Sequence, residues 1–282
     1  MDFAVKCIRS WSDFTECVSK LPAHWAYRGQ SEDWPLKTSL ERALKDWDID
    51  LSLAPGIEQQ LVREFRRQYR GDDCRLVNDD TLYCLTLMQH HGAPTRLLDC
   101  TYSPFVAAKF AIEAGAKTPV IWAINTGWCY KAAEKVVGTS SVAARNIDKS
   151  RNDSSFVPLY MDAESSKRFA LADGSLDLSS ARLVAQQGLF MCPGDAGATF
   201  VDNLKAMDGW DSSSNIIKLL VKLNRPELVK VFIMLRKMNV FSAVLFPGLD
   251  GFARSLRDSI PLYEDFARRK IGQPGHSTES TI

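Results

Sequence analysis

Three short segments of the chain carry polar side chains at positions where neither a core nor a turn requires them. The first is residues 27–31, in which an arginine and a glycine follow a short aromatic run. A guanidinium at the end of a strand can form two parallel hydrogen bonds to a carboxylate or a phosphate, and Gly29 would let a ligand approach the backbone closely. The segment therefore predicts either a ligand-binding Arg28 or an Arg28 buried against an acid.

The second segment, residues 89–104, places two histidines, an arginine, an aspartate and several hydroxyl groups around a helix end, a turn and a helix start. His90 and His91 are adjacent, so on a helix they point about 100° apart and cannot both face one site. No Gly-x-Ser-x-Gly turn presents a nucleophile, which disfavours a Ser-His-Asp catalytic triad.

The end of this second segment also has an ordinary structural interpretation. Thr101 or Ser103 would cap the helix that follows. Asp99 would pair with Arg96. A capping role leaves room for ligand contact, so both interpretations stay open.

The third segment, residues 181–190, is apolar except for Arg182 and a Gln-Gln-Gly insertion. Two glutamines before a glycine in an apolar strand suggest a β-bulge that directs the amide of Gln186 or Gln187 into a cleft. Alternatively, these amides satisfy neighbouring backbone groups.

The surrounding sequence predicts both helices and strands. Apolar residues at helical spacing, with Ser, Thr or Pro at the starts, predict helices over 10–21, 37–47, 55–69, 81–91, 103–111 and 226–238. Runs of β-branched and aromatic residues predict strands over 24–27, 120–124, 156–161, 183–192 and 216–223, the last as a strand or a short helix. The polar residues 135–155 predict a long surface loop.

The order of these elements predicts the fold class. Helices dominate the first half and strands gather after residue 118, so we expect one mixed α+β domain over residues 1–271, with a central cleft. Residues 272–282 are polar, with Gly, Pro, Ser and Thr, and we expect this tail to be disordered.

Composition excludes several protein classes. The 282 residues carry 35 Lys and Arg against 34 Asp and Glu, and 45% are hydrophobic, which excludes collagen-like, coiled-coil and wholly disordered chains. The seven cysteines contain no Cys-x-x-Cys pair, which argues against a disulfide framework and a zinc site. The sequence shows no signal peptide and no apolar run of about 20 residues. We therefore expect a cytoplasmic protein with no metal and no membrane partner.

Together the three segments resemble the FRG domain family, named for a Phe-Arg-Gly signature. Residues 27–30 read Tyr-Arg-Gly-Gln, with one aromatic residue in place of another. Residues 90–101 match the family's His-x-Gly-x-Pro-Thr-Arg-Leu-Leu-Asp-Trp-Thr signature, with cysteine in place of tryptophan, and residues 186–190 match a Gln-Gln-Gly-x-Phe element. Residues 245–251 resemble the closing motif of the family, so the resemblance extends roughly over residues 10–255.

The order of the segments is also similar, more loosely, to that in ADP-ribosyltransferases of the Arg-Ser-Glu type. Those enzymes carry aromatic-Arg-Gly on one strand, Ser/Thr-x-Ser on a second strand before an Ala- and Phe-rich helix, and a Glu-x-Glu or Gln-x-Glu turn last. This chain has residues 27–29, then Thr101-x-Ser103 before the stretch 105–111, then residues 186–188. The resemblance implies an enzyme that cleaves the nicotinamide–ribose bond of NAD and transfers ADP-ribose to a macromolecule.

The same resemblance implies roles for the polar residues. Arg28 would bind the pyrophosphate of NAD, and Thr101 and Ser103 would hold the nicotinamide ribose. Tyr27 or Tyr102 would stack on nicotinamide. In full, the implied catalytic residues are Arg28, Asp99, Thr101 and Gln187, and the implied NAD-binding residues are Tyr27, Arg28, Gly29, Gln30, His91, Thr95, Arg96, Ser103 and Gln186.

The chain departs from the enzyme pattern at the acid. Cleavage of the glycosidic bond passes through an oxocarbenium-like state that a carboxylate stabilises. The third segment holds Gln186 and Gln187 but no acid. Asp99, or a carboxylate from another segment such as Glu164, would have to supply it.

Two functions from different classes therefore stay open. The first is an enzyme that transfers ADP-ribose, with nucleic acid favoured over protein as the acceptor, or that simply hydrolyses NAD; a toxin or antiviral-defence role would suit it. This function requires that Arg28, Thr101 and Gln187 line one cleft. The second is a non-catalytic module that binds a nucleotide or a phosphorylated ligand, and a cleft without an acid would favour it.

Two sets of basic residues bear on a nucleic-acid acceptor. Four arginines lie three or four residues apart, or next to one another, on the helix predicted from residue 55: Arg63, Arg66, Arg67 and Arg70. This stripe predicts contact with phosphates, although Glu58 and Glu64 on the same helix favour an ordinary solvated face. A second basic set near the end of the chain comprises Arg254, Arg257, Arg268, Arg269 and Lys270.

Overall fold

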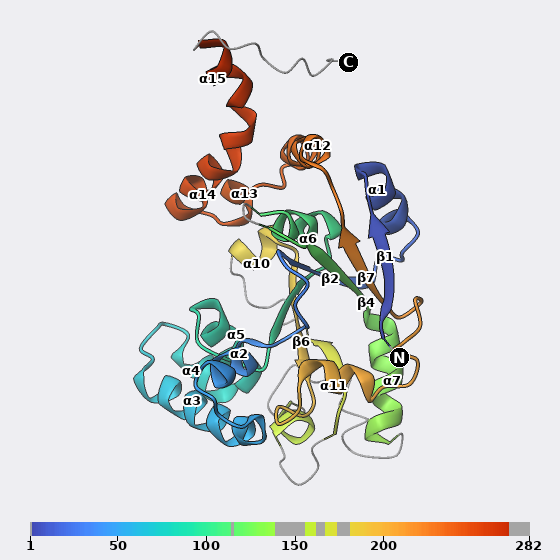
Figure 1. The fold of residues 1–282 in the computed structure, drawn as a ribbon. Helices are drawn as coiled ribbons and strands as arrows, with labels where there is room; N and C mark the ends of the chain where they lie inside the picture. The colour runs from blue at the N-terminus through green and yellow to red at the C-terminus, as the bar shows by residue number, and fades with distance from the viewer. Residues whose placement is uncertain (1, 114–115, 139–155, 162–166, 174–180, 271–282) are drawn as a thin grey trace.

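The structure is a computed structural model that describes residues 2–113, 116–138, 156–161, 167–173 and 181–270. Its strands are β1 (Ala4–Ile8), β2 (Trp25–Gln30), β3 (Leu98–Thr101), β4 (Val120–Asn125), β5 (Ala170–Asp173), β6 (Gly188–Pro193) and β7 (Ile216–Val221). They form one seven-stranded sheet in the order β1-β7-β4-β2-β3-β6-β5 (Figure 1). β1 and β7 are parallel, and the other neighbouring strands are antiparallel. The predicted mixed α+β class is confirmed, with strands drawn from both halves of the chain.

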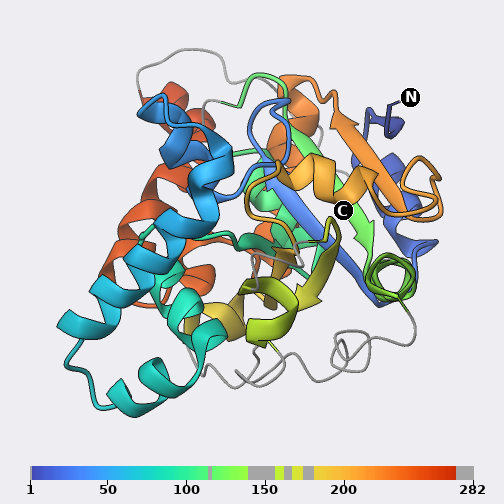
Figure 2. The same cartoon turned by 90° about the horizontal axis from the view of Figure 1, so that it is seen from below.

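The helices of the first half are α1 (Trp11–Ser19), α2 (Ser39–Asp46), η1 (Leu51–Leu53), α3 (Ala54–Gln68), α4 (Cys74–Asp79), α5 (Thr81–His90), α6 (Pro104–Ala111) and α7 (Thr126–Val137). Those of the second half are the π-helical turn η3 (Val157–Met161), α10 (Ala181–Ala185), α11 (Phe200–Lys205), α12 (Arg225–Lys237), α13 (Ser242–Leu245), α14 (Leu249–Ser259), η5 (Ile260–Leu262) and α15 (Glu264–Lys270). Figure 2 shows α2 to α5, in blue to teal, gathered to one side of the sheet.

Both faces of the sheet are covered, which explains why β4 is apolar without alternation. Successive side chains of a strand point to opposite faces. Val120, Trp122 and Ile124 pack into one cluster, to which α3, α4, α5, α7 and α11 contribute. Ile121 and Ala123 pack into the other cluster, with α1, α6 and α12.

The sheet opens between two of its strands. β2 and β3 pair at a single position, Tyr27 with Thr101, whereas β2 and β4 pair along six positions. Among the described residues, β2 has no strand partner on its β3 side beyond Tyr27, and Arg28 lies in this unpaired part of β2.

Some predicted strands are wrong. Residues 157–161 form the π-helical turn η3, and residues 183–185 belong to α10, so that the strand begins only at Gly188. A short apolar run fits a buried helical turn as well as a buried strand, and only packing decides between them. The strands β1, β3 and β5 were not among the strands predicted from apolar runs. The predicted loop lies mostly at 139–155, outside the described residues, as does the predicted tail at 272–282.

Candidate functional site

The three motif segments lie on neighbouring strands and meet in one row of the sheet. Tyr27 of β2 pairs with Thr101 of β3, and Thr101 pairs in turn with Gly188 of β6. Residues that are more than 70 positions apart along the chain are therefore brought to one level of the sheet, beside the opening between β2 and β3.

A cavity of about 770 Å³ occupies this opening. Seven of the residues implied by sequence line it, and these are Tyr27, Arg28, Gly29, Gln30, Asp99, Thr101 and Gln186. Its volume falls in the range of about 300–1,000 Å³ that is typical of small-molecule sites. The expected cleft therefore exists where the motifs predicted it.

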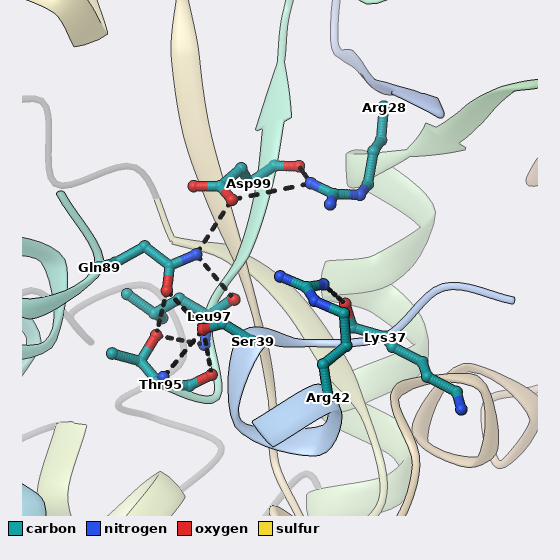
Figure 3. Close-up of polar contacts among 8 residues, drawn as sticks. All are labelled: Arg28, Lys37, Ser39, Arg42, Gln89, Thr95, Leu97 and Asp99. Carbon is teal, nitrogen blue, oxygen red and sulfur yellow. Dashed lines mark hydrogen bonds and ion pairs between the residues drawn. The ribbon is translucent and has the colours of Figure 1, made fainter. Parts of the chain in front are cut away.

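Arg28 is the central basic group of the cleft. Its guanidinium donates a hydrogen bond from Nη1 to the carbonyl of Asp99 (2.5 Å), and the Asp99 carboxylate lies 3.8 Å away (Figure 3). The Nε atom is buried and has no hydrogen-bond partner among the described residues. Because a buried donor without a partner is costly, this side chain is suited to a ligand that supplies the missing acceptor.

Asp99 places a carboxylate in the cleft. Its Oδ2 accepts a hydrogen bond from Nε2 of Gln89 (3.0 Å), and the side chain is 56% exposed. Gln89 is itself fixed, since its Oε1 accepts from the hydroxyls of Ser39 (2.7 Å) and Thr95 (2.8 Å) (Figure 3). The carboxylate is thus held in place while its surface stays open. Glu164, the other acid considered, lies outside the described residues.

A second cavity of about 360 Å³ adjoins the first. The two share Asp99, Arg182 and Gln186 as lining residues. The second cavity is otherwise lined by the polar residues Thr86, Gln89, His90 and His91 and by apolar and aromatic residues. Burial and the neighbouring His91 lower the pKa of His90 below its usual value.

Thr101 and Ser103 have structural roles in the described chain. The Thr101 hydroxyl donates to the carbonyl of Gln186 (2.7 Å) and accepts from the backbone of Ser103 (2.9 Å). Ser103 caps α6 by accepting from the backbone of Val106, as one of the two sequence interpretations predicted. Both residues are buried, and their hydroxyls already form hydrogen bonds within the protein. Their implied contact with a ribose therefore has no support in the geometry.

Gln187 does not line the cleft, contrary to its implied catalytic role. It adopts a positive φ of 47° where the chain turns from α10 into β6, and its carbonyl accepts from the backbone of Tyr102. The expected β-bulge is therefore wrong: the segment is a helix-to-strand turn. Gln186 lines the cleft instead, and its amide donates to the carbonyl of Leu245 (2.9 Å).

Gly29 serves packing rather than ligand approach. A Cβ at this position would lie 1.9 Å from the carbonyl oxygen of Ala107, so the glycine lets β2 and α6 come together. Gln30 is held by the Trp122 indole, which donates to its Oε1 (2.8 Å). Tyr27 is buried in the wall of the cleft, and this burial raises its pKa to about 12.

Arg96 is buried away from the cleft. Its guanidinium binds Glu58 (2.5 Å) and the carbonyl of Tyr160 (2.7 Å), and the side chains of the ion pair are 2% and 0% exposed. The predicted Arg96–Asp99 pair is therefore wrong, and so is the implied NAD contact. Thr95 is likewise buried and outside the cleft lining, while His91 is exposed and lines only the second cavity.

Most arginines of the stripe form hydrogen bonds or an ion pair with residues of α3 and its neighbours. Arg66 binds the carbonyl of Val77 and the hydroxyl of Thr81. Arg67 pairs with Glu64 (2.7 Å), and Arg70 donates to backbone carbonyls. Arg63 is exposed. A solvated helix face describes the stripe better than a phosphate-binding groove.

The sequence reasoning missed a group of basic residues on the far wall of the cleft. Lys37, just before α2, and Arg42 and Lys45, within α2, line this wall. They fell within the predicted helix 37–47, and the gathering of three basic residues within nine positions was the available signal. Trp34 also lines the cleft and is 50% exposed.

Two further observations concern metals and membranes. Within the described ranges, no three or more His, Cys, Asp or Glu side chains gather closely enough to hold a metal ion. None of the described helices combines the length and the apolar character needed to cross a bilayer.

Comparison with known proteins bears on the matched motifs. Residues 23–119 match the sequence profile of the FRG domain, a range that includes the first two motif segments and excludes the third. No curated protein and no solved structure matches the chain. The chain therefore carries an FRG domain, over residues 23–119.

Proposed function

We propose that the chain is an NAD-dependent ADP-ribosyltransferase. Its cleft binds NAD, the bond between nicotinamide and ribose breaks, and ADP-ribose passes to a nucleophile of a macromolecular acceptor. The acceptor then loses a proton and nicotinamide leaves as the neutral base. We place nucleic acid ahead of protein as the acceptor, and water as the acceptor gives simple hydrolysis.

The observation that carries the proposal is the row formed by Tyr27, Thr101 and Gly188, of which Tyr27 and Thr101 line one cleft. It places Arg28, with an unused buried donor, beside the carboxylate of Asp99. In the proposed reaction, Arg28 binds phosphate oxygens of NAD. The Asp99 carboxylate stabilises the positive charge that develops on the ribose as nicotinamide departs.

The alternative is a module that binds a nucleotide without turning it over. It is favoured by the position of Gln187 outside the cleft and by the occupied hydroxyl of Thr101. The requirement that Arg28, Thr101 and Gln187 line one cleft is not met, because Gln187 lies outside the cleft that Arg28 and Thr101 line. Asp99 in the cleft supports the enzyme, and Gln186 is the glutamine that remains to orient a ribose hydroxyl.

One experiment separates the two functions. Purified protein is incubated with NAD, alone and with DNA, RNA or a protein mixture, and free nicotinamide is followed by chromatography. We expect release by the unaltered protein, at least 100-fold slower release by Arg28→Ala, and unchanged release by Arg75→Ala, an exposed arginine on α4. Folded protein that releases no nicotinamide with any acceptor would contradict the enzyme and leave the binding module.

A further inference from the structure

The cleft is lined by more basic than acidic side chains. Five basic side chains line it: Arg28, Lys37, Arg42, Lys45 and Arg182. Three acids line it as well, and one of them, Glu113, already contacts the buried Lys109 (3.3 Å). Concave walls that bear mostly one sign of charge concentrate ligands of the opposite sign, so the cleft is built for an anion.

Arg28 and Arg42 approach this anion site from opposite walls. Arg28 extends from β2, and Arg42 extends from α2 with its guanidinium directed toward the same space beside Asp99 (Figure 3). Partial burial, and next the charge of Arg28, lower the pKa of Arg42. The two cations are therefore close enough to repel each other, and an anion between them would relieve that repulsion.

Both guanidinium groups keep donors for a ligand. Arg42 uses Nη1 to bind the carbonyl of Lys37 (2.7 Å), which fixes its direction. Arg28 uses Nη1 on the carbonyl of Asp99, and its Nε is buried without a partner among the described residues. Neither Arg42 nor the flanking Lys37 and Lys45 forms an ion pair within the part of the chain that the structure describes.

The number and placement of these groups distinguish between anions. A carboxylate or a single phosphate needs one guanidinium fork. Two forks on opposite walls, flanked by two lysines, match a ligand with two linked phosphates. The aromatic side chains of Trp34, Tyr27 and Phe110 in the same cleft provide apolar surface for a ring attached to those phosphates.

We propose that Arg28 and Arg42 together form a diphosphate subsite, so that the cleft selects nucleoside diphosphate esters over monophosphates. The identity of the ester as NAD rests on the proposed function, whereas the selection for two phosphates does not require turnover.

Calorimetric titration of the full chain with ADP, AMP and inorganic pyrophosphate tests the subsite. We expect the unaltered protein to bind ADP about tenfold or more tightly than AMP, because the second phosphate gains a charge-assisted fork. Arg42→Ala should bind ADP about tenfold more weakly while changing AMP binding much less, and Arg42→Lys should recover part of the loss. Arg75→Ala should bind both nucleotides as the unaltered protein does. Pyrophosphate alone should compete with ADP.

Equal affinities for ADP and AMP, or ADP affinity that does not change in Arg42→Ala, would overturn the diphosphate subsite. Thermal melting confirms that each variant is folded, and Arg42 lies on the exposed side of a short helix, where its removal leaves the core intact. The nicotinamide-release assay tests the proposed enzyme independently of the binding measurements. Selective ADP binding without nicotinamide release would defeat the proposed enzyme and leave the diphosphate subsite. Nicotinamide release that Arg42→Ala leaves unchanged would support the enzyme and defeat the diphosphate subsite.

Discussion

Two arginines of this chain stand beside acids in opposite circumstances. Arg96 is sealed in the core with Glu58, and its donors meet a carboxylate and a backbone carbonyl at hydrogen-bond distance. Arg28 stands in a cleft, 3.8 Å from the Asp99 carboxylate, with its Nε unused among the described residues. The first pair is closed and structural. The second is open, and the difference between them separates an arginine that holds the fold from one that is available to a ligand.

The largest expected effect comes from breaking the closed pair. Glu58→Ala should lower the free energy of unfolding by about 3–5 kcal/mol, because it leaves the buried Arg96 without a counter-charge. Urea denaturation followed by circular dichroism measures the loss. Replacing both residues with apolar ones, as in Glu58→Leu with Arg96→Met, should recover much of the stability. If Glu58→Ala were as stable as the unaltered protein, the pair would not be structural.

Breaking the open pair should affect function instead of stability. Asp99→Asn keeps the shape of the side chain and removes the charge, so we expect nicotinamide release to fall about 100-fold through lost stabilisation of the ribose cation. The free energy of unfolding should change by less than about 1 kcal/mol, as is usual for exposed ion pairs. Activity that survives in Asp99→Asn would assign the acid role to another residue.

A smaller effect is expected from the residue that positions Asp99. Gln89→Met removes the hydrogen bond to the Asp99 carboxylate and keeps the side-chain length. We expect kcat for nicotinamide release to fall about tenfold, as for the loss of other orienting contacts, while the KM for NAD stays nearly unchanged. A change in KM with constant kcat would instead place Gln89 in binding.

The smallest effect concerns Tyr27, the buried neighbour of Arg28. Because burial raises the pKa of Tyr27 to about 12, the folded form keeps the proton at a pH where the unfolded chain loses it. The contribution of Tyr27 to stability is thus complete below about pH 10 and is lost as the pH rises toward 12. Tyr27→Phe should lose less stability between pH 9 and 11.5 than the unaltered protein, by thermal melting at each pH. Parallel curves for the two proteins would contradict this.

The sequence alone predicted the fold class and six of the helices. Strong helical periodicity, together with starts such as Ser103-Pro104, located α1, α2, α3, α5, α6 and α12, because caps and apolar spacing are local properties. The short apolar runs at 156–161 and 183–185 were misassigned. Such runs satisfy strand and helix alike until the core that surrounds them is known.

For the site, the sequence identified the segments and the tertiary structure sorted their residues. Motif order predicted that Arg28, Thr101 and Gln187 would line one cleft. Arg28 and Thr101 do so, and Gln187 does not. Spacing could not show that Arg96 meets Glu58, 38 residues away, or that Gly29 exists for the close approach of α6. It also could not show that Arg42 faces Arg28.

What the sequence determined by itself was therefore the local chemistry: the helix starts, the apolar faces and the motif segments with their polar groups. What only the tertiary structure decided was which of those polar groups are satisfied. Satisfaction depends on partners that are distant along the chain, and it is set by how β2, β3 and β6 align. Arg96 finds its carboxylate inside the core, whereas Arg28 reaches the opening between β2 and β3 with a donor still to be used.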